Sequence, residues 1–264
     1  MAHAQDGPVA LVTGGAGGIG TAICRQLATQ GYRLVVVDYD VAGAKQVEQS
    51  VGGSAFEADV SDPEHNRAMV AHAIAEFGRL DLVVLNAGVS SGQSPGDPLS
   101  LELYRRTTGV NLDGVVFGID AAVPVLSRDG GAIVVMASLA ALGPEDANPV
   151  YALTKCAVLG YVRAIAGTLA EHRVRVNAIC PGFVDTAILG IGRKLLRKQK
   201  FPLLSPDEVA EAVMTVLDQA GTGEAWTIIA GRPPDRFAFP TLPITLMPDG
   251  SEAKLRPFLA PRTN

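Results

Sequence analysis

The chain has 264 residues, of which 48% are hydrophobic, 19% charged and 5% aromatic, with a formal net charge of −5. This length fits one large α/β domain or two small ones, and the apolar content excludes a mainly disordered chain. The acidic balance disfavours a nucleic-acid partner, because proteins that bind nucleic acids generally are basic. The sequence shows neither a signal peptide nor an uncharged apolar run of membrane length. We therefore expect a cytoplasmic protein without a membrane partner.

Cysteine and histidine contents bear on redox compartment and on metal binding. The three cysteines, Cys24, Cys156 and Cys180, are far apart and form no CxxC pair. They suit a reducing compartment, and each is expected to be a small buried residue. The four histidines lack metal-ligand spacing, so no metal site is expected.

Short apolar runs alternate along the chain with longer segments of helical period. The predicted strands are 8–13, 33–38, 80–86, 132–138, 173–179 and 225–230, and the predicted helices are 19–30, 41–51, 63–77, 100–127, 150–171 and 206–219. Continuous runs of Val, Ile and Leu are typical of parallel strands that are covered on both faces. We predict one α/β domain over 1–231, a Rossmann-type doubly wound parallel sheet in three layers. The proline-rich residues 232–264 form a C-terminal tail, either ordered on the surface or partly disordered.

A glycine-rich turn, TGGAGGIG at 13–20, lies between the first predicted strand and the first predicted helix. Two patterns overlap in it: GxGxxG through Gly15, Gly17 and Gly20, and TGxxxGxG through Gly14, Gly18 and Gly20. Residues without a Cβ let the backbone turn sharply and approach a pyrophosphate, whose charge meets the helix N-terminus. The strand before the turn and the helix after it therefore indicate a dinucleotide site.

Asp38 ends the second predicted strand, 18 residues after Gly20. A carboxylate at this position accepts the adenosine ribose hydroxyls and repels a 2′-phosphate. This favours NAD over NADP as the cofactor. The alternative is an aspartate that caps a helix or forms a turn.

Tyr151 and Lys155 are four residues apart, on one face of the predicted helix 150–171. A cation close to a phenol favours the phenolate, which lowers the tyrosine pKa toward a range useful for proton transfer. Such pairs also occur by chance on helix surfaces. Ser138 favours the catalytic interpretation, because it ends a buried strand at the sheet edge where doubly wound folds bind ligands.

With these motifs the chain resembles the classical short-chain dehydrogenase/reductase family. The matching elements follow the family order over roughly 1–190: TGGAGGIG at 13–20, Asp59-Val60, Asn86-Ala87-Gly88, Asn111, Ser138, Tyr151-x-x-x-Lys155 and Pro181-Gly182-x-Val184-x-Thr186. The resemblance implies Tyr151 as the general acid/base and Lys155 as a ligand of the nicotinamide ribose that, together with the cationic nicotinamide ring, lowers the Tyr151 pKa. It further implies that Ser138 hydrogen-bonds the substrate oxygen and that Asn111 holds a water molecule in a proton relay.

The family also implies which residues contact the cofactor and the substrate. The cofactor contacts are Gly14, Gly17, Gly18, Ile19, Gly20, Asp38, Asp59, Val60, Asn86, Ala87, Gly88, Tyr151, Lys155, Pro181, Gly182, Val184 and Thr186. A mobile lid is implied at about 186–205, where the basic cluster 193–200 is otherwise expected to be a solvated helix face. The expected substrate contacts are Ser138, Leu139, Leu142, Tyr151, Phe183 and Ile188. They are mostly apolar and favour a hydrophobic or alicyclic alcohol over a sugar, although Glu145, Asp146 and Asn148 add polar groups nearby.

We therefore predict an NAD-dependent oxidoreductase that interconverts a secondary alcohol and its ketone by hydride transfer. The alternatives are a physiological ketone reductase, a lyase or epimerase that uses NAD transiently, and a non-catalytic NAD-sensing or scaffold protein. Small residues on the predicted helix 150–171 would let two helices approach closely, which predicts a homodimer or homotetramer.

Overall fold

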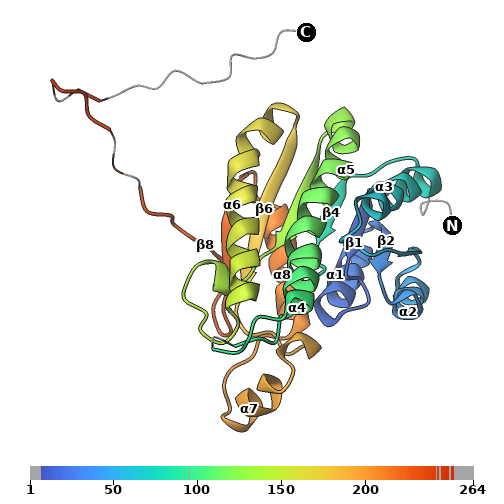
Figure 1. Cartoon of the computed structure of the whole chain (residues 1–264). Helices are drawn as coiled ribbons and strands as arrows, with labels where there is room; N and C mark the ends of the chain where they lie inside the picture. Colours follow the sequence, from blue (N-terminus) through green and yellow to red (C-terminus); the bar gives the residue numbers. More distant parts are fainter. Residues whose placement is uncertain (1–6, 95, 242, 244, 250, 253–264) are drawn as a thin grey trace.

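A single eight-stranded sheet forms the centre of the molecule (Figure 1). The computed structural model describes residues 7–94, 96–241, 243, 245–249 and 251–252. Its strands are β1 (Val9–Thr13), β2 (Arg33–Asp38), β3 (Ser54–Glu57), β4 (Leu82–Leu85), β5 (Gly131–Met136), β6 (Val174–Pro181), β7 (Ala225–Ile228) and β8 (Asp235–Arg236). The order is β3-β2-β1-β4-β5-β6-β7-β8, and only β8 is antiparallel to its neighbour. The strand order therefore reverses between β1 and β4, which confirms the predicted doubly wound α/β fold.

Helices cover both faces of the sheet and make three layers (Figure 1). One layer contains α1 (Gly18–Thr29), α2 (Val41–Val51) and α8 (Pro206–Leu217), and the other contains α3 (Pro63–Phe77), α5 (Gly114–Asp129) and α6 (Pro149–Glu171). Two shorter helices, α4 (Leu101–Thr108) and α7 (Gly192–Lys198), lie toward the edge of the sheet that carries the site.

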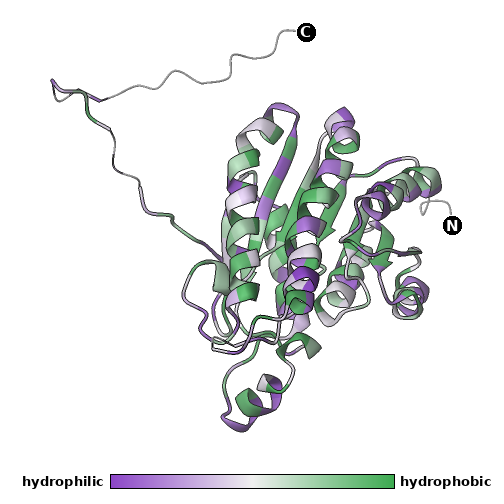
Figure 2. Cartoon of the chain, in the orientation of Figure 1, coloured by the Kyte–Doolittle hydropathy of each residue, from purple (hydrophilic) through white to green (hydrophobic). Residues whose placement is uncertain are grey.

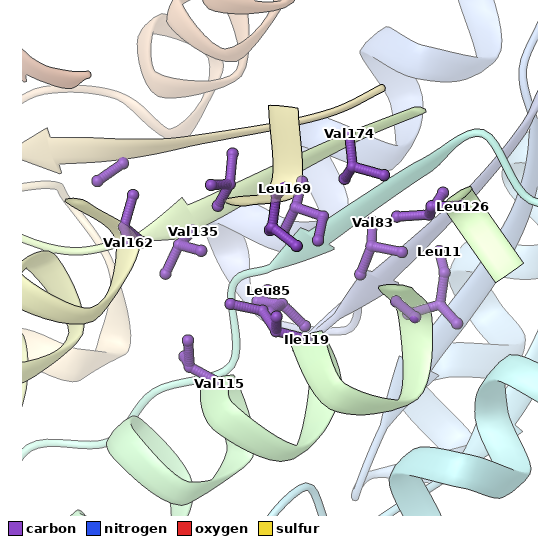
Figure 3. Close-up of a cluster of buried hydrophobic side chains, with 14 of the residues drawn as sticks. Leu11, Val83, Leu85, Val115, Ile119, Leu126, Val135, Val162, Leu169 and Val174 are labelled. Carbon is purple, nitrogen blue, oxygen red and sulfur yellow. The ribbon is translucent and has the colours of Figure 1, made fainter. Parts of the chain in front are cut away.

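The two layers explain the continuous apolar strands. Val9 and Leu11 of β1 pack with the α3, α5 and α6 layer, whereas Ala10 and Val12 pack with the α1, α2 and α8 layer. Successive side chains of a strand point to opposite faces, so a sheet covered on both faces needs apolar residues throughout. Figure 3 shows the first of these cores between the sheet and α5 and α6. In Figure 2 the strands are mostly hydrophobic, whereas the helices around them carry a mixture of hydrophilic and hydrophobic residues.

The predicted helix 100–127 is interrupted in the structure. It consists of α4, a π-helical turn at Gly109–Asp113, and α5. The surrounding packing is tight, because a Cβ on Gly114 would lie 2.8 Å from Val60 Cγ2. The turn also holds the side chain of Asn111 in hydrogen bonds to the loop after β4. In the sequence, neither the glycines at 109 and 114 nor Asn111 indicates that the helix contains such a turn.

Two strands were not predicted, and both are short. β3 has the sequence SAFE and is only partly buried, so it lacks the apolar run that marks the other parallel strands. β8 contains two exposed residues, Asp235 and Arg236, and is recognisable only by its pairing with β7.

Beyond β8 the chain stays attached to the domain before it projects outward. The Phe237 amide donates to the Ala225 carbonyl at 2.8 Å. The rings of Phe237 and Phe239 meet edge to face with centroids 5.0 Å apart, and the Arg163 guanidinium lies 3.7 Å from the Phe239 ring centroid. From Pro240 onward the described residues are exposed and extend away from the body (Figure 1). The tail predicted at 232–264 thus has a docked beginning, and its residues 253–264 lie outside the described part.

Two stretches, 101–129 and 149–171, are long and apolar enough to cross a membrane by length and composition alone. Both flank the sheet and pack against it, which accounts for part of their apolar character (Figure 1). In each, 39% of the apolar window is buried. Most of their other apolar side chains are partly exposed, and the large ones that are exposed are Leu101, Tyr104 and Leu153.

The cysteine prediction is correct at two positions and wrong at the third. Cys24 and Cys180 are buried, but Cys156 is exposed because it lies on the outer face of α6. Among the described residues, no group of three His, Cys, Asp or Glu side chains is placed to hold a metal ion.

Candidate active site

The turn between β1 and α1 is shaped so that backbone can lie close to a ligand. Gly14 has φ +64°, and a Cβ there would lie 2.9 Å from the Ala87 Cα; a Cβ on Gly20 would lie 2.0 Å from the Gly14 carbonyl oxygen. Gly17 is less restricted, since its nearest contact would be 3.3 Å away. A Cβ on Gly15 would lie 2.6 Å from Val36 Cγ1, so each of the two overlapping sequence patterns includes tightly packed positions. No side chain caps the start of α1, so its first N–H groups are available to an anion.

Asp38, the last residue of β2, stabilises the glycine turn through a hydrogen bond. Its Oδ2 accepts the Ala16 N–H at 2.9 Å, and its Oδ1 accepts the Asp40 N–H at 2.9 Å. Asp40, not Asp38, is the N-cap of α2, where its Oδ1 accepts the Gly43 N–H at 3.1 Å. The carboxylate of Asp38 therefore forms a turn and also lines the cleft beside the glycines.

The segment after β4 fixes the glycine turn from the other side. Asn86 Nδ2 donates to the carbonyls of Thr13 at 3.0 Å and Gly14 at 3.1 Å. In return, Thr13 Oγ1 accepts the Asn86 N–H at 3.0 Å and the Ala87 N–H at 3.2 Å. This network joins two predicted cofactor segments into one rigid wall.

Asp59 and Val60 follow β3 and also line the cleft. Asp59 Oδ1 accepts the Ser61 N–H at 2.9 Å and the Ser61 hydroxyl at 2.7 Å. Val60 is buried against Gly114 of α5. Both residues are thus held in place by neighbours that the sequence motif does not include.

Ser138, Tyr151 and Lys155 come together where β5 ends and α6 begins. Ser138 Oγ accepts the Ala140 N–H at 3.2 Å, and the Ser138 hydroxyl lies close enough to the Tyr151 hydroxyl to lower the pKa of that phenol. Lys155 is buried, its Nζ donates to the Met136 carbonyl at 2.6 Å, and it lies 5.7 Å from the Tyr151 ring centroid. A Cβ on Gly88 would lie 3.6 Å from this Nζ, so the glycine keeps the space beside the ammonium open.

Burial has the largest effect on the ionisation of Tyr151. It raises the Tyr151 pKa in the chain alone; the nearby Ser138 hydroxyl lowers it, and the charges of Glu145 and Cys180 raise it further. Lys155 is not among the groups that shift the Tyr151 pKa in the chain by itself, and its lowering of this pKa together with the cationic nicotinamide ring stays a prediction. Burial also lowers the pKa of Lys155, to about 8, because the apolar surroundings disfavour its charged form.

Asn111 lies in the π-helical turn Gly109–Asp113, within the stretch predicted as the helix 100–127. Its Oδ1 accepts the Val89 N–H at 2.8 Å, and its Nδ2 donates to the Val89 carbonyl at 2.9 Å and to Thr154 Oγ1 at 3.2 Å. It is fully buried and does not line the cleft. Its side chain positions the loop that borders Lys155, and its part in a proton relay stays a prediction.

The segment after β6 reaches the glycine turn and carries the lid. The Gly182 N–H donates to the Ile228 carbonyl at 2.9 Å, and a Cβ on Gly18 would lie 3.1 Å from Thr186 Cγ2. Asp185 accepts hydrogen bonds from Arg193 and Arg197 of α7, and these bonds lower its pKa to about 2. The two arginines of the basic cluster therefore fasten α7 to the predicted cofactor segment instead of only facing solvent.

These segments enclose one cleft of about 1980 Å³. A single drug-sized ligand needs roughly 300–1,000 Å³, so this cleft has room for a dinucleotide and a substrate together. Every predicted cofactor contact lines it, as do Ser138, Leu139, Tyr151, Phe183 and Ile188. Leu142 does not, because its side chain packs on the core beside α6. Sequence reasoning missed further lining residues that belong to no motif: Tyr39, Ser90, Arg106, Leu196 and Phe201.

Comparisons with known proteins agree with this geometry. Residues 8–194 match the family model described as short chain dehydrogenase. The chain is 36% identical over 230 residues to a D-threitol dehydrogenase of Mycolicibacterium smegmatis, covering 81% of this chain and 87% of the relative. It is 35% identical over 197 residues to 15-hydroxyprostaglandin dehydrogenase (NAD(+)) of Homo sapiens, covering 70% of this chain and 71% of the relative.

A similar solved structure is that of a 3-ketoacyl-(acyl-carrier-protein) reductase from Brucella melitensis, complexed with NADH. It matches with a TM-score of 0.79 and 31% identity, and the match covers 86% of this chain and 99% of that chain. The family match spans the glycine turn, Ser138, Tyr151 and Lys155. The chain therefore belongs to the short-chain dehydrogenase family and is an oxidoreductase.

Proposed function

We propose that this protein is an NAD-dependent dehydrogenase that interconverts a secondary alcohol and its ketone. The proposal rests on one observation above all: Ser138, Tyr151 and Lys155 meet in the same cleft as the glycine turn. Related proteins whose names state alcohol dehydrogenase activity support it.

The residues present fit a bound dinucleotide. A Cβ on Gly14 or Gly20 would collide with backbone, so glycine at both positions permits this tight turn. The turn then leaves room for a pyrophosphate at the α1 N-terminus. Asp38 lies beside that turn and offers acceptors to the adenosine ribose. The nicotinamide, when bound, supplies hydride chemistry.

The chain's own residues then handle the alcohol proton. The phenolate of Tyr151 accepts it during oxidation and the phenol returns it during reduction. The Ser138 hydroxyl, which lies near Tyr151 in the cleft, holds the substrate oxygen beside it. Lys155 is buried next to Gly88 and contributes its ammonium to the nicotinamide ribose and to the stability of the phenolate. The same residues serve both directions, so ketone reduction is the alternative within this class.

Purified protein is expected to reduce NAD in the presence of secondary alcohols, because the predicted base and the predicted nicotinamide site share one cleft. The measurement is the rise of NADH absorbance with a panel of cyclic, acyclic and polyhydroxy secondary alcohols. NADP with the same alcohols is the control and is expected to react more slowly, because Asp38 disfavours a 2′-phosphate. Absence of turnover with both cofactors across the panel would contradict the proposal.

We also propose that the protein assembles as a homodimer or homotetramer through the outer faces of α4, α5 and α6. The outer face of α6 carries small exposed residues, Ala157, Gly160, Ala164 and Gly167. A Cβ on Gly160 or Gly167 would meet nothing within 4 Å, so a second helix could approach closely there. The exposed side chains of Leu101 and Tyr104 on α4 and of Leu153 on α6 add apolar surface.

Light scattering at micromolar concentration is expected to give a mass of two or four chains. A variant that ends after Phe239 keeps the docked beginning of the tail and removes the exposed remainder. If the tail lies across a neighbouring subunit, this variant will form assemblies of fewer chains, or it will unfold at a lower temperature than the full chain. A monomeric mass for the full chain would contradict the assembly proposal.

A further inference from the structure

The charged side chains of the cleft are unevenly distributed. Among the described lining residues, the carboxylates of Asp38, Asp40 and Asp59 follow β2 and β3. Neighbouring strands are about 4.8 Å apart, and β2 lies three strands from β5, so these carboxylates are remote from Ser138. Glu145 is the acidic residue at the other end, in the turn between Ser138 and Tyr151.

Glu145 is held in this position by its own turn. Its Oε1 accepts the Ala147 N–H at 3.2 Å, and the residue is partly buried. Its charge is close enough to the Tyr151 hydroxyl to raise the pKa of that phenol, after the larger effect of burial. No salt bridge of the described residues includes Glu145, so its charge is not neutralised by a basic partner.

The neighbouring polar groups are already paired with one another. Asn148 Nδ2 donates to Ser90 Oγ at 2.6 Å, and Asn148 Oδ1 accepts from the Ser91 hydroxyl. Their hydrogen-bonding capacity is largely used within the protein. Glu145 is therefore the group on this wall with the strongest remaining capacity to accept a hydrogen bond.

Many of the other lining residues are apolar, and they come mainly from the predicted lid and the segment before it. Among them are Leu139, Phe183, Ile188, Ile191, Leu196 and Phe201. Phe183 and Phe201 pack edge to face with centroids 5.6 Å apart. A substrate bound at this end of the cleft therefore contacts mostly apolar side chains, and the carboxylate it can contact there is that of Glu145. Such surroundings strengthen the interaction of Glu145 with any charge or hydroxyl on the substrate.

We propose that Glu145 determines substrate specificity: it favours neutral alcohols with a second hydroxyl near the reacting carbon and disfavours those with a carboxylate there. The inference rests on the proposed function and narrows its substrate class. A second hydroxyl can donate a charge-assisted hydrogen bond to Glu145. A substrate carboxylate in the same position is repelled by Glu145, and the Lys155 ammonium is directed to the Met136 carbonyl; the other basic lining residue, Arg106, comes from α4.

The test compares wild type with Glu145→Gln on three probes: cyclohexanol, trans-1,2-cyclohexanediol and 2-hydroxycyclohexanecarboxylate. Relative to cyclohexanol, we expect Glu145→Gln to raise kcat/KM for the hydroxy acid about tenfold, because the repulsion is removed. It should lower kcat/KM for the diol about threefold to tenfold, because a charged acceptor becomes neutral. The matched control is Asp146→Asn, which removes the same charge from the adjacent, exposed residue outside the cleft.

A second readout separates an electrostatic role from a structural one. The groups that affect Tyr151 are Ser138, Glu145 and Cys180, with Lys155 beneath its ring. Removing the negative charge of Glu145 lowers the pKa of Tyr151, so the pH at which cyclohexanol oxidation rises should move downward. Asp146→Asn should leave this profile unchanged, and thermal unfolding should show that both variants are folded.

The outcomes distinguish the two proposals. Turnover of the probes with substrate ratios that Glu145→Gln leaves unchanged would overturn the specificity role and leave the dehydrogenase proposal intact. Equal changes in Glu145→Gln and Asp146→Asn would also overturn it, because the effect would then come from the loss of one negative charge and not from the position of Glu145. If wild type converts none of the probes and none of the wider alcohol panel, both proposals are wrong.

Discussion

Replacing Tyr151 by Phe is expected to lower kcat for alcohol oxidation about 10²–10⁴-fold, the usual contribution of a general acid/base. The ring stays and continues to fill its partly buried position, while the hydroxyl that transfers the proton is lost. NAD affinity should change little, because the glycine turn and Asp38 are untouched. Steady-state kinetics and a titration of NAD binding measure the two quantities separately.

The direction in which the two reaction rates should change with pH follows from the protonation state of Tyr151. Only the phenolate accepts a proton, so oxidation should rise with pH through the Tyr151 pKa, and reduction should fall over the same range. Burial raises that pKa in the chain alone, whereas the Lys155 ammonium and the charge of oxidised nicotinamide favour the phenolate. Tyr151→Phe should remove this step from the profile.

Tyr161→Phe is the matched control, because Tyr161 lies on the same helix and does not line the cleft. It should keep both the rate and the pH dependence of wild type. A loss smaller than tenfold in Tyr151→Phe would show that another group moves the proton.

Replacing Asp38 by Ala is expected to reduce the preference for NAD over NADP, measured as the ratio of kcat/KM values, by roughly 10–100-fold. This range corresponds to the loss of charge-assisted hydrogen bonds to the ribose, each worth roughly 1.5–3 kcal/mol. Repulsion of a 2′-phosphate disappears in the same variant. Because Asp38 also accepts the Ala16 N–H, affinity for both cofactors should fall, and only their ratio reports selectivity.

The control for this prediction is Asp62→Ala. Asp62 caps α3 and accepts the Glu64 N–H at 2.8 Å, but it does not line the cleft. Its removal takes away a structural carboxylate and should leave the cofactor ratio unchanged. A wild-type protein that already prefers NADP would contradict the role given to Asp38.

The local chemistry of this protein is largely readable from its sequence. Continuous apolar runs predict strands covered on both faces, and each predicted strand has a counterpart in the sheet. The TGGAGGIG turn is also readable, because Gly14 and Gly20 occupy positions where any Cβ would collide with backbone. A tight turn of this kind requires residues without a Cβ, so it can be predicted from the glycines in the sequence.

The tertiary structure alone decided features that depend on distant neighbours. Burial, not the nearby Lys155, dominates the Tyr151 pKa of the chain, and burial is a property of the assembled cleft. Leu142 packs away from the cleft, and Asn111 is held inside a π-helical turn by Val89. Asp185 binds Arg193 and Arg197 only because the lid folds back on the segment from which it starts. Side-chain direction, desolvation and pairing across many residues arise from packing, and residue spacing along the chain does not encode them.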